Sequence, residues 1–274
     1  MIDLSAIASR LEQRPDGIWV SKNRSDVDYP SFGSDVCFEI EDTSFWFAHR
    51  NACVAAMCRR HLRERVVFDI GGGNGFVSLG LQREGFETVL VEPSPSAMHH
   101  AATRDIAHRV CSTFDDAGFV DGAAPNVGLF DVLEHIAEPV PFLRGIRRIL
   151  HPGGRLVLTV PAYNSLWSYE DEIARHHRRY TRASLRAQLE SAGFAVADST
   201  YFFSFLPVPI LLARALPWRL GLLKDEAVTR TSAQHRPPGG LVKRILDALR
   251  GFELRRIERA SSLPFGGSIL AVAR

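Results

Sequence analysis

Cysteine is scarce in this sequence of 274 residues. The four cysteines form no CxxC pair and have no histidine at a spacing that zinc would need, so we expect no structural metal site. Nor does the sequence show a tight cluster of carboxylates of the kind that holds magnesium. An apolar signal stretch near Met1 is also missing. These absences predict a protein of the reducing cytoplasm that binds no metal.

Long hydrophobic runs are missing as well. The most apolar stretch, residues 201–216, contains Pro207, Pro209 and Arg214, and it is shorter than the roughly 20 residues of a transmembrane helix. Between residues 241 and 254, apolar residues recur at near-helical spacing with lysine and arginine among them. Such a helix can lie on a membrane surface, cover a hydrophobic substrate pocket or dock on the core, and the sequence leaves these three interpretations open.

Acidic residues are depleted in the C-terminal part. Residues 1–174 contain 16 basic and 24 acidic residues, whereas residues 175–274 contain 17 and 7. A net charge of −8 is thus followed by one of +10, although the whole chain carries only +2. The basic part suits an anionic membrane, a phosphorylated substrate or a nucleic acid, or it is a solvated surface without a partner.

The sequence does contain an alternation of short apolar runs and helical patterns between residues 66 and 160. This alternation is typical of βαβ units, so we expect an α/β fold with a parallel sheet and helices on both faces. Helices are predicted at residues 140–150 and 181–191. Strands are predicted at residues 66–70, 88–92, 109–112, 127–132, 155–160, 194–200 and 268–273.

A glycine-rich loop, Asp69-Ile70-Gly71-Gly72-Gly73-Asn74-Gly75, follows the first strand. Its glycines let a ligand approach the backbone closely. A dinucleotide-binding loop would have GxGxxG spacing and would seat a pyrophosphate on the helix N-terminus. Here the spacing is GxGxG, and Asp69 would repel a pyrophosphate but attract an ammonium group. These features favour S-adenosylmethionine, which carries an ammonium group and no phosphate, over NAD.

A second carboxylate is expected at the same edge of the sheet. Glu92 ends the second strand, 17 residues after Gly75, where it can accept hydrogen bonds from both hydroxyls of a ribose. A single strand-end acid is often structural. Two of them around one glycine loop indicate a nucleoside-binding site.

Three segments together resemble one family. The glycine loop looks like motif I of the class I S-adenosylmethionine-dependent methyltransferases, and residues 151–156 are similar to their turn into strand five. The segment Leu129-Phe130-Asp131-Val132-Leu133-Glu134-His135 resembles the fourth-strand motif of the bacterial group that contains the ubiquinone-biosynthesis O-methyltransferases. The resemblance implies a Rossmann-like sheet of seven strands, the last one antiparallel, with S-adenosylmethionine as cofactor and S-adenosylhomocysteine as product.

The resemblance also implies which residues contact the cofactor. They are Asp69, Gly71, Gly73, Asn74 and Gly75 around the methionine portion, Glu92 and Pro93 at the ribose, Phe114 and Asp115 at the adenine, and Phe130 and Asp131 at the methyl-bearing end.

Methyl transfer is an in-line displacement that depends mostly on positioning, but a hydroxyl acceptor also benefits from a base. His135, just past strand four, is the first candidate because imidazole titrates near neutral pH. His176 and His177 are further candidates, and Arg178 and Arg179 suit an anionic acceptor. A capping histidine and a polar helix entry are the alternative interpretations of these residues.

The chain is predicted to divide into an N-terminal segment with a lid helix (1–62), a cofactor-binding core (63–200), an apolar and basic insertion (201–262) and a final core strand (263–274). We expect methyl transfer to a small-molecule or lipid-like acceptor, with O-methylation favoured. An NAD-dependent oxidoreductase and a non-catalytic methyltransferase-like binding protein remain alternatives. Nucleic acid is not an expected partner, because no Asp/Asn-Pro-Pro-Tyr motif follows strand four. Peripheral membrane contact and the oligomeric state are left open.

Overall fold

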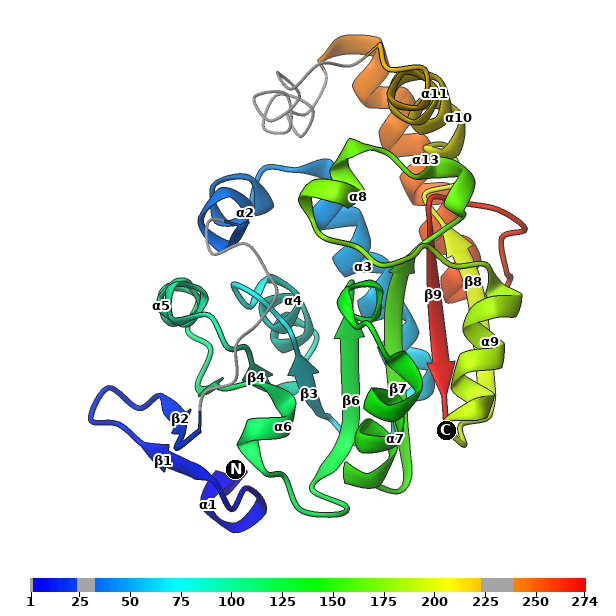
Figure 1. The fold of residues 1–274 in the computed structure, drawn as a ribbon. Coiled ribbons are helices and arrows are strands. Elements are labelled where there is room, and N and C mark those ends of the chain that lie inside the picture. Colours follow the sequence, from blue (N-terminus) through cyan, green and yellow to red (C-terminus); the bar gives the residue numbers. More distant parts are fainter. Residues whose placement is uncertain (1, 24–32, 223–238) are drawn as a thin grey trace.

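A computed structural model describes residues 2–23, 33–222 and 239–274 of the chain. Its centre is one sheet in the order β1-β2-β5-β4-β3-β6-β7-β9-β8 (Figure 1). Neighbouring strands from β2 to β7 are parallel, and β9 is antiparallel to both β7 and β8. The strands are β1 (Leu11–Gln13), β2 (Trp19–Ser21), β3 (Val66–Ile70), β4 (Glu87–Val91), β5 (His108–Cys111), β6 (Ala124–Phe130), β7 (Leu150–Pro161), β8 (Val196–Phe202) and β9 (Ser268–Ala273).

Seven of these strands, β3 to β9, confirm the predicted Rossmann-like sheet with its last strand antiparallel. The sheet has nine described strands rather than seven, because β1 and β2 form an antiparallel pair that extends it beyond β5. Each added strand has three residues, which is too short for an alternation of apolar and polar side chains to reveal it.

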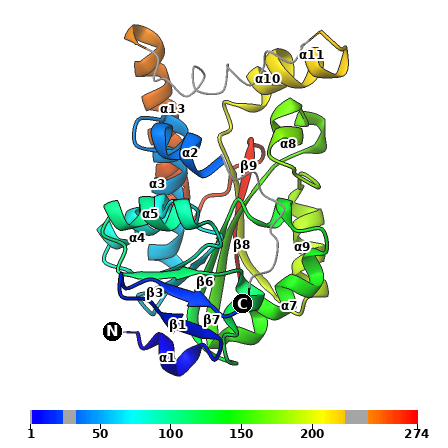
Figure 2. The ribbon, with the colours of Figure 1, turned by 60° about the vertical axis from the view of Figure 1, so that its left-hand side comes forward.

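Helices cover both faces of the sheet (Figure 2). Buried side chains of α3, α4 and α13 form one core cluster with one face, and those of α7 and α9 join the cluster on the other. The helices are α1 (Leu4–Ile7), α2 (Gly33–Glu41), α3 (Phe45–His61), α4 (Phe76–Arg83), α5 (Pro95–Thr103), α6 (Phe114–Ala117), α7 (Pro139–Ile149), α8 (Tyr169–Ile173), α9 (Arg182–Ser191), α10 (Pro207–Ile210), α11 (Leu216–Arg219) and α13 (Gly240–Glu258), with the short 3-10 helices η1 (Leu133–His135) and η2 (Asn164–Leu166) and the π-helix η3 (Leu211–Ala215).

Side-chain caps explain where several of these helices begin. The hydroxyl of Ser44 accepts the N–H of Trp46 at the start of α3, and that of Ser94 accepts the N–H of Ala97 at the start of α5. Thr181 likewise caps α9, as its sequence predicts. The start of α3 matters for function, because it sets which residues of this helix face the carboxyl ends of the strands.

One buried carboxylate helps to tie the segment between β8 and β9 to the core. Glu253 of α13 is fully buried and lies 2.8 Å from Nε2 of His49 on α3. It also accepts the backbone N–H groups of Phe203 and Ser204, which follow β8. Although burial alone would raise the pKa of Glu253, the hydrogen bonds from His49 and Ser204 hold it below the ordinary 4.5. The insertion is thus anchored to α3 and to the end of β8.

None of the helices in the described part of the chain combines the length and the hydrophobicity needed to cross a bilayer.

Candidate active site

The glycine loop joins β3 to α4 at the edge where the parallel strands end (Figure 1). Gly71, Gly73 and Gly75 all have positive φ angles, a conformation that side chains rarely adopt. At Gly73, with φ of 54°, a Cβ atom would meet nothing within 4 Å, so this backbone faces open space. The loop therefore leaves room for a ligand beside Gly73.

Asp69 lies beneath this loop, at the end of β3. Its carboxylate is fully buried, and Oδ2 accepts a hydrogen bond of 2.7 Å from the hydroxyl of Ser78. Its Oδ1 has no hydrogen-bond partner among the described residues. Burial raises the pKa of Asp69 to about 6. The side chain thus lies under the loop, and its Oδ1 accepts no hydrogen bond from a described residue.

Glu92 connects two loops at the ends of neighbouring strands. Its carboxylate accepts the N–H of Gly73 at 3.2 Å and the N–H of Ser94 at 3.0 Å. Burial raises the pKa of Glu92 to about 7, although these two hydrogen bonds oppose the shift. Pro93 follows it and is half-buried. The sequence-predicted pairing of Glu92 with the glycine loop is therefore present in space.

Other predicted cofactor residues have side chains engaged elsewhere. Oδ1 of Asn74 lies 3.0 Å from His100 Nδ1, and its Nδ2 donates to Glu41 at 3.4 Å. The ring of Phe114 packs between Phe119 and Phe142 in the core. A contact of Asn74 or Phe114 with a cofactor stays a prediction, and for Asn74 it would use the backbone or displace one of these bonds.

Two further predicted cofactor residues differ in their exposure. Asp115, in the first turn of α6, is exposed. Phe130, at the end of β6, is buried among the core residues that face α3 and α13. Their predicted roles at the adenine and at the methyl-bearing end are likewise untested.

Asp131 is joined to helix α3 by an ion pair that the sequence did not reveal. Its Oδ2 lies 2.6 Å from Nη1 of Arg50 on α3, and its Oδ1 accepts the hydroxyl of Thr159 at 3.0 Å. The Arg50 guanidinium lies 5.0 Å from the ring centre of Trp46 and 5.1 Å from that of Phe47. The predicted lid segment therefore supplies a cation to the end of β6.

Arg50 also acts on the carboxyls around it. Its charge opposes the rise in pKa that burial imposes on Asp69 and on Glu134. One guanidinium thus lies within electrostatic range of the acid beneath the glycine loop and of the acids after β6. The only sequence signal for it was the aromatic segment that precedes it, residues 45–47.

Two of the three candidate histidines come together. The rings of His135 and His176 have centroids 4.7 Å apart and meet edge to face. Nδ1 of His176 lies 2.8 Å from Oδ1 of Asp171, a fully buried carboxylate that Arg179 also binds through two nitrogens. His177 is exposed, and its backbone N–H donates to the carbonyl of Glu134. His177 therefore takes no part in the ring contact between His135 and His176, although it also contributes to the lowered pKa of His135.

The electrostatics of this pair follow from burial and from neighbouring charge. Burial, followed by the nearby His176, lowers the pKa of His135 to about 4, so this imidazole is neutral at physiological pH. Burial alone would raise the pKa of Asp171, but hydrogen bonds from His176 and Arg179 hold it below the ordinary 3.8. An ionised Asp171 fixes the orientation of the His176 ring.

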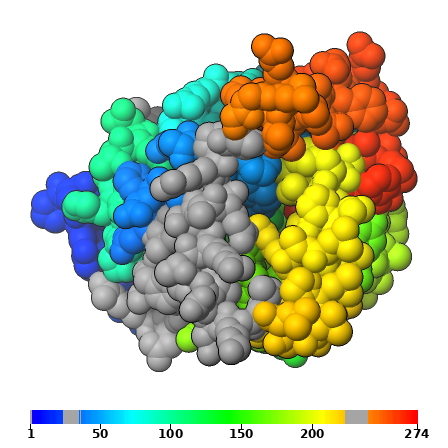
Figure 3. Space-filling view, turned by 90° about the horizontal axis from the view of Figure 1, so that it is seen from above, coloured from blue at the N-terminus to red at the C-terminus, as the bar shows by residue number. Residues whose placement is uncertain are grey.

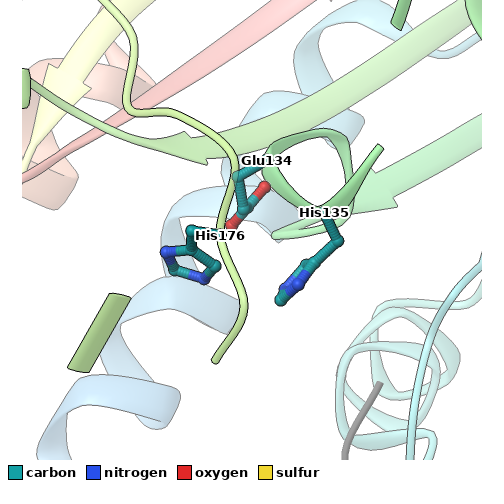
Figure 4. A group of neighbouring side chains, drawn as sticks. All are labelled: Glu134, His135 and His176. Atoms are coloured by element: carbon teal, nitrogen blue, oxygen red, sulfur yellow. The ribbon is translucent and has the colours of Figure 1, made fainter. Parts of the chain in front are cut away.

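Glu134 completes this group (Figure 4). It is 1% exposed, and its Oε2 has no hydrogen-bond partner among the described residues. Burial, and then the charge of Asp131, raises its pKa well above the ordinary 4.5. Ligand atoms of Glu134, His135 and His176 all lie within 4.8 Å of one another, so these three residues have the composition and spacing of a metal-binding group.

The arginines expected to bind an anionic acceptor are already engaged. Arg179 binds Asp171, and Nη2 of Arg178 donates to the carbonyl of Ala137 at 2.7 Å. Both therefore brace the loop that carries His176.

Comparison with known proteins identifies relatives of this chain. Residues 47–199 match the family model of the methyltransferase domain. An uncharacterized methyltransferase of Mycobacterium sp. (strain KMS) is 30% identical over 123 residues, which are 44% of this chain and 49% of that protein. The ubiquinone biosynthesis O-methyltransferase of Xanthomonas euvesicatoria pv. vesicatoria (strain 85-10) is 28% identical over 151 residues, 48% of this chain and 63% of that protein. The chain spans about half the length of the first of these curated relatives.

Solved structures share the fold at low sequence identity. A chain of the complex between the Haloferax volcanii Trm112 methyltransferase activator and a methyltransferase has a TM-score of 0.58 at 20% identity, and the match covers 91% of this chain and 98% of that one. The [4+2]-cyclase SpnF has a TM-score of 0.51 at 18% identity, covering 82% and 80%. The family match extends over more than half of the residues, and the sheet has the expected strand order, so the chain belongs to the methyltransferase domain family and has the class I, Rossmann-like fold.

Proposed function

We propose that this protein transfers the methyl group of S-adenosylmethionine to a hydroxyl group of a small-molecule or lipid-like acceptor. One observation carries the proposal. The carboxylate of Glu92 is held against the open backbone of Gly73, and the ends of the neighbouring strands bring a histidine pair to the same edge of the sheet. A nucleoside site and a proton acceptor are thus carried by adjacent loops.

The residues fit the cofactor in charge and shape. Glu92 would accept hydrogen bonds from the ribose hydroxyls, and the open side of Gly73 would hold the methionine portion. Asp69, with its unused Oδ1, places negative charge near the ammonium group. The cofactor would supply a methyl group on a sulfonium, whose sulfur leaves as a neutral thioether and is therefore a good leaving group. S-adenosylhomocysteine is then the product.

The protein's own contribution is to position the acceptor and to take up its proton. As the acceptor oxygen forms a bond to the methyl carbon, the bond between that carbon and sulfur breaks, and the hydroxyl proton passes to an imidazole. His176 suits this role because Asp171 holds its Nδ1 at 2.8 Å and stabilises the imidazolium that forms. His135 stays neutral beside it and can accept a hydrogen bond from the acceptor.

A second version of the same reaction is favoured by Glu134. A carboxylate oxygen of Glu134 lies within 4.8 Å of ligand atoms of His135 and His176, and its buried Oε2 has no hydrogen-bond partner in the described part of the chain. A divalent cation held there would bind the acceptor oxygen and lower the pKa of its hydroxyl. Turnover measured after exhaustive chelation separates the two versions. Full activity supports proton transfer to His176, whereas loss of activity with recovery on adding magnesium or zinc supports the cation.

Binding is tested first, by calorimetric titration with S-adenosylmethionine, S-adenosylhomocysteine and NAD. Gly73→Val is expected to abolish binding, because the new side chain fills the space beside the loop. Gly85→Val is the matched control, because Gly85 has a positive φ angle and open space too but lies in the turn before β4. If both variants lost affinity equally, backbone strain rather than the filled space would be the cause. Binding of NAD alone would contradict the assignment of the loop to S-adenosylmethionine.

Turnover is then tested with radiolabelled cofactor and a panel of phenolic, aliphatic and lipid-linked hydroxyl compounds. Methyl transfer to a member of the panel, lost in His176→Asn with cofactor affinity retained, supports the proposal. The [4+2]-cyclase shows why binding alone does not suffice, since the activity in its name is not methyl transfer although its fold is similar. Cofactor binding without transfer to any hydroxyl would contradict the proposed reaction.

A further inference from the structure

Exposed apolar side chains gather at one end of the molecule. Among the described residues, eleven of the fourteen large apolar side chains with high exposure lie between residues 208 and 252. Leu220 and Leu222 are 68% and 70% exposed, and Leu241 is 72% exposed. We call the exposed apolar residues of segments 208–222 and 241–252 the apolar surface. A protein does not normally leave so many large apolar groups in water on one end unless they have a partner.

The exposed apolar side chains of α13 are not the ones that pack on the core. With 3.6 residues per turn, Leu241, Ile245 and Phe252 fall on one stripe of the helix. A different stripe contains Leu254 and Ile257, which pack in the core cluster beside α3. In the first half of the helix, residues 241–245 and 247–249 are all exposed. The helix therefore carries one covered apolar stripe and one that nothing in the described chain covers.

The apolar surface lies at the same end of the molecule as the candidate active site. In Figure 2, α13 and the pair α10 and α11 stand apart from each other at the end toward which the parallel strands point. The view onto this end in Figure 3 shows both segments at the surface. The loops that follow the parallel strands, and with them the candidate active site, lie at this same end.

Positive charge accompanies the apolar groups. Segments 207–222 and 240–259 contain eight arginines and lysines and three acids, and one of the acids, Glu253, is buried. Arg244 is exposed on α13 next to the apolar stripe, and Arg219 is exposed on α11. Two copies of this surface would bring like charges together, whereas the headgroups of an anionic membrane would neutralise them while their acyl chains receive the apolar side chains.

We propose that the apolar surface docks on anionic lipid membranes, with the α13 stripe and the 208–222 segment inserted at the level of the headgroups. This inference goes beyond methyl transfer and does not require it. If the proposed function also holds, the docked orientation places the candidate active site over the membrane, so the acceptor class would be a membrane lipid or an amphiphile dissolved in it.

The test is flotation of the full-length protein with vesicles, without cofactor, so that its outcome is independent of catalysis. We expect binding to vesicles of phosphatidylcholine mixed with phosphatidylglycerol, weak binding to phosphatidylcholine alone, and weakening as salt is raised. Arg244→Gln should lower the affinity about five-fold, the effect of one membrane-facing cation. Failure to bind anionic vesicles would overturn the proposal.

Substitutions of the apolar groups test the contact itself. Leu241→Glu combined with Ile245→Glu should lower vesicle affinity about ten-fold or more, because both the apolar contact and the charge balance are changed. Val120→Glu is the matched control, since Val120 is also exposed but precedes β6 at the opposite end of the sheet. Equal effects of the two changes would overturn the assigned surface.

Two further measurements distinguish membrane docking from misfolding and from self-association. Each substituted side chain is exposed, so the thermal unfolding temperature should match that of the parent protein, and circular dichroism checks this. Sedimentation velocity tests a second copy as the occupant. A dimer that the Leu241→Glu and Ile245→Glu pair dissociates, together with no vesicle binding by the parent protein, would assign the surface to self-association and overturn the membrane proposal.

Discussion

The affinity for S-adenosylmethionine should depend on pH through Glu92. The pKa of this carboxyl is raised to about 7, and only the ionised form presents two charged acceptors to the ribose hydroxyls. Because binding favours the carboxylate, the proton is released on binding, and affinity rises with pH through this pKa. At pH 6 only about one tenth of the groups are ionised, so the affinity there should be about ten-fold lower than at pH 8.

The Glu92→Gln variant isolates this contribution. Its amide oxygen can still accept one of the N–H groups of Gly73 and Ser94, so the loops keep a partner. At pH 8 the variant loses charge-assisted hydrogen bonds of about 1.5–3 kcal/mol, which corresponds to roughly 10–150-fold weaker binding. Its affinity should also change little between pH 6 and pH 8, apart from a smaller effect of Asp69, whose pKa is about 6.

Isothermal titration calorimetry in two buffers of different ionisation enthalpy measures both the affinity and the protons released. Circular dichroism at each pH checks that the protein remains folded. Equal wild-type affinity at pH 6 and pH 8 would refute this reasoning. So would a Glu92→Gln variant that is as sensitive to pH as the wild type, because the titrating group would then lie elsewhere.

Three other substitutions test the site. Arg50→Met should destabilise the fold by about 2–3 kcal/mol in urea unfolding, because it leaves the mostly buried Asp131 carboxylate without its 2.6 Å partner. Unchanged stability would mean that the ion pair is energetically neutral. Asp171→Asn should lower turnover about 10–100-fold and leave cofactor affinity unchanged, since it removes the charge that supports an imidazolium at His176. An unaffected rate would exclude His176 as the proton acceptor. His177→Ala should keep turnover within about two-fold in the same assay, because His177 contacts Glu134 only through its backbone; a large loss would return this histidine to the site.

The features that the sequence predicts well are local in the chain. The strand, the glycine loop and the following helix lie within residues 66–83, and glycine leaves a pattern that can be recognised without knowing the fold. Glu92 follows from the same logic, because the ends of parallel strands meet at one edge of a sheet. Strand β9 matches its predicted residues, 268–273, because it is apolar from Ile269 onward and follows a loop that contains Pro264, Gly266 and Gly267.

The features that the sequence does not predict depend on contacts between distant segments. Arg50 and Asp131 are 81 residues apart, and their pairing requires α3 to pack across the end of β6. Nothing in the order of residues distinguishes His176 from His177 either. The turn at Arg175, which has a φ of 55°, together with the bond that His176 makes to Asp171 decides which ring faces His135.

The group formed by Glu134, His135 and His176 escapes sequence prediction for a related reason. Its carboxylate and first histidine are adjacent in the chain, but the second histidine arrives from a loop some forty residues later. Only the packing of that loop against η1 brings His176 to Glu134 and His135. Burial, and then the charge of Asp131, raises the pKa of Glu134, so its environment rather than its residue type sets its protonation.

The anchoring of α13 through Glu253 determines how this protein can be cut and recombined. Four polar groups, on His49, Phe203 and Ser204, have this one carboxylate as their partner. Phe203, Ser204 and Glu253 exchange together with the insertion, so a chimaera that replaces it without the matching α3 would leave the buried His49 without its carboxylate partner. Segments 45–61, 196–206 and 240–258 therefore form one exchangeable unit, and the natural cut points for chimaeras lie outside it.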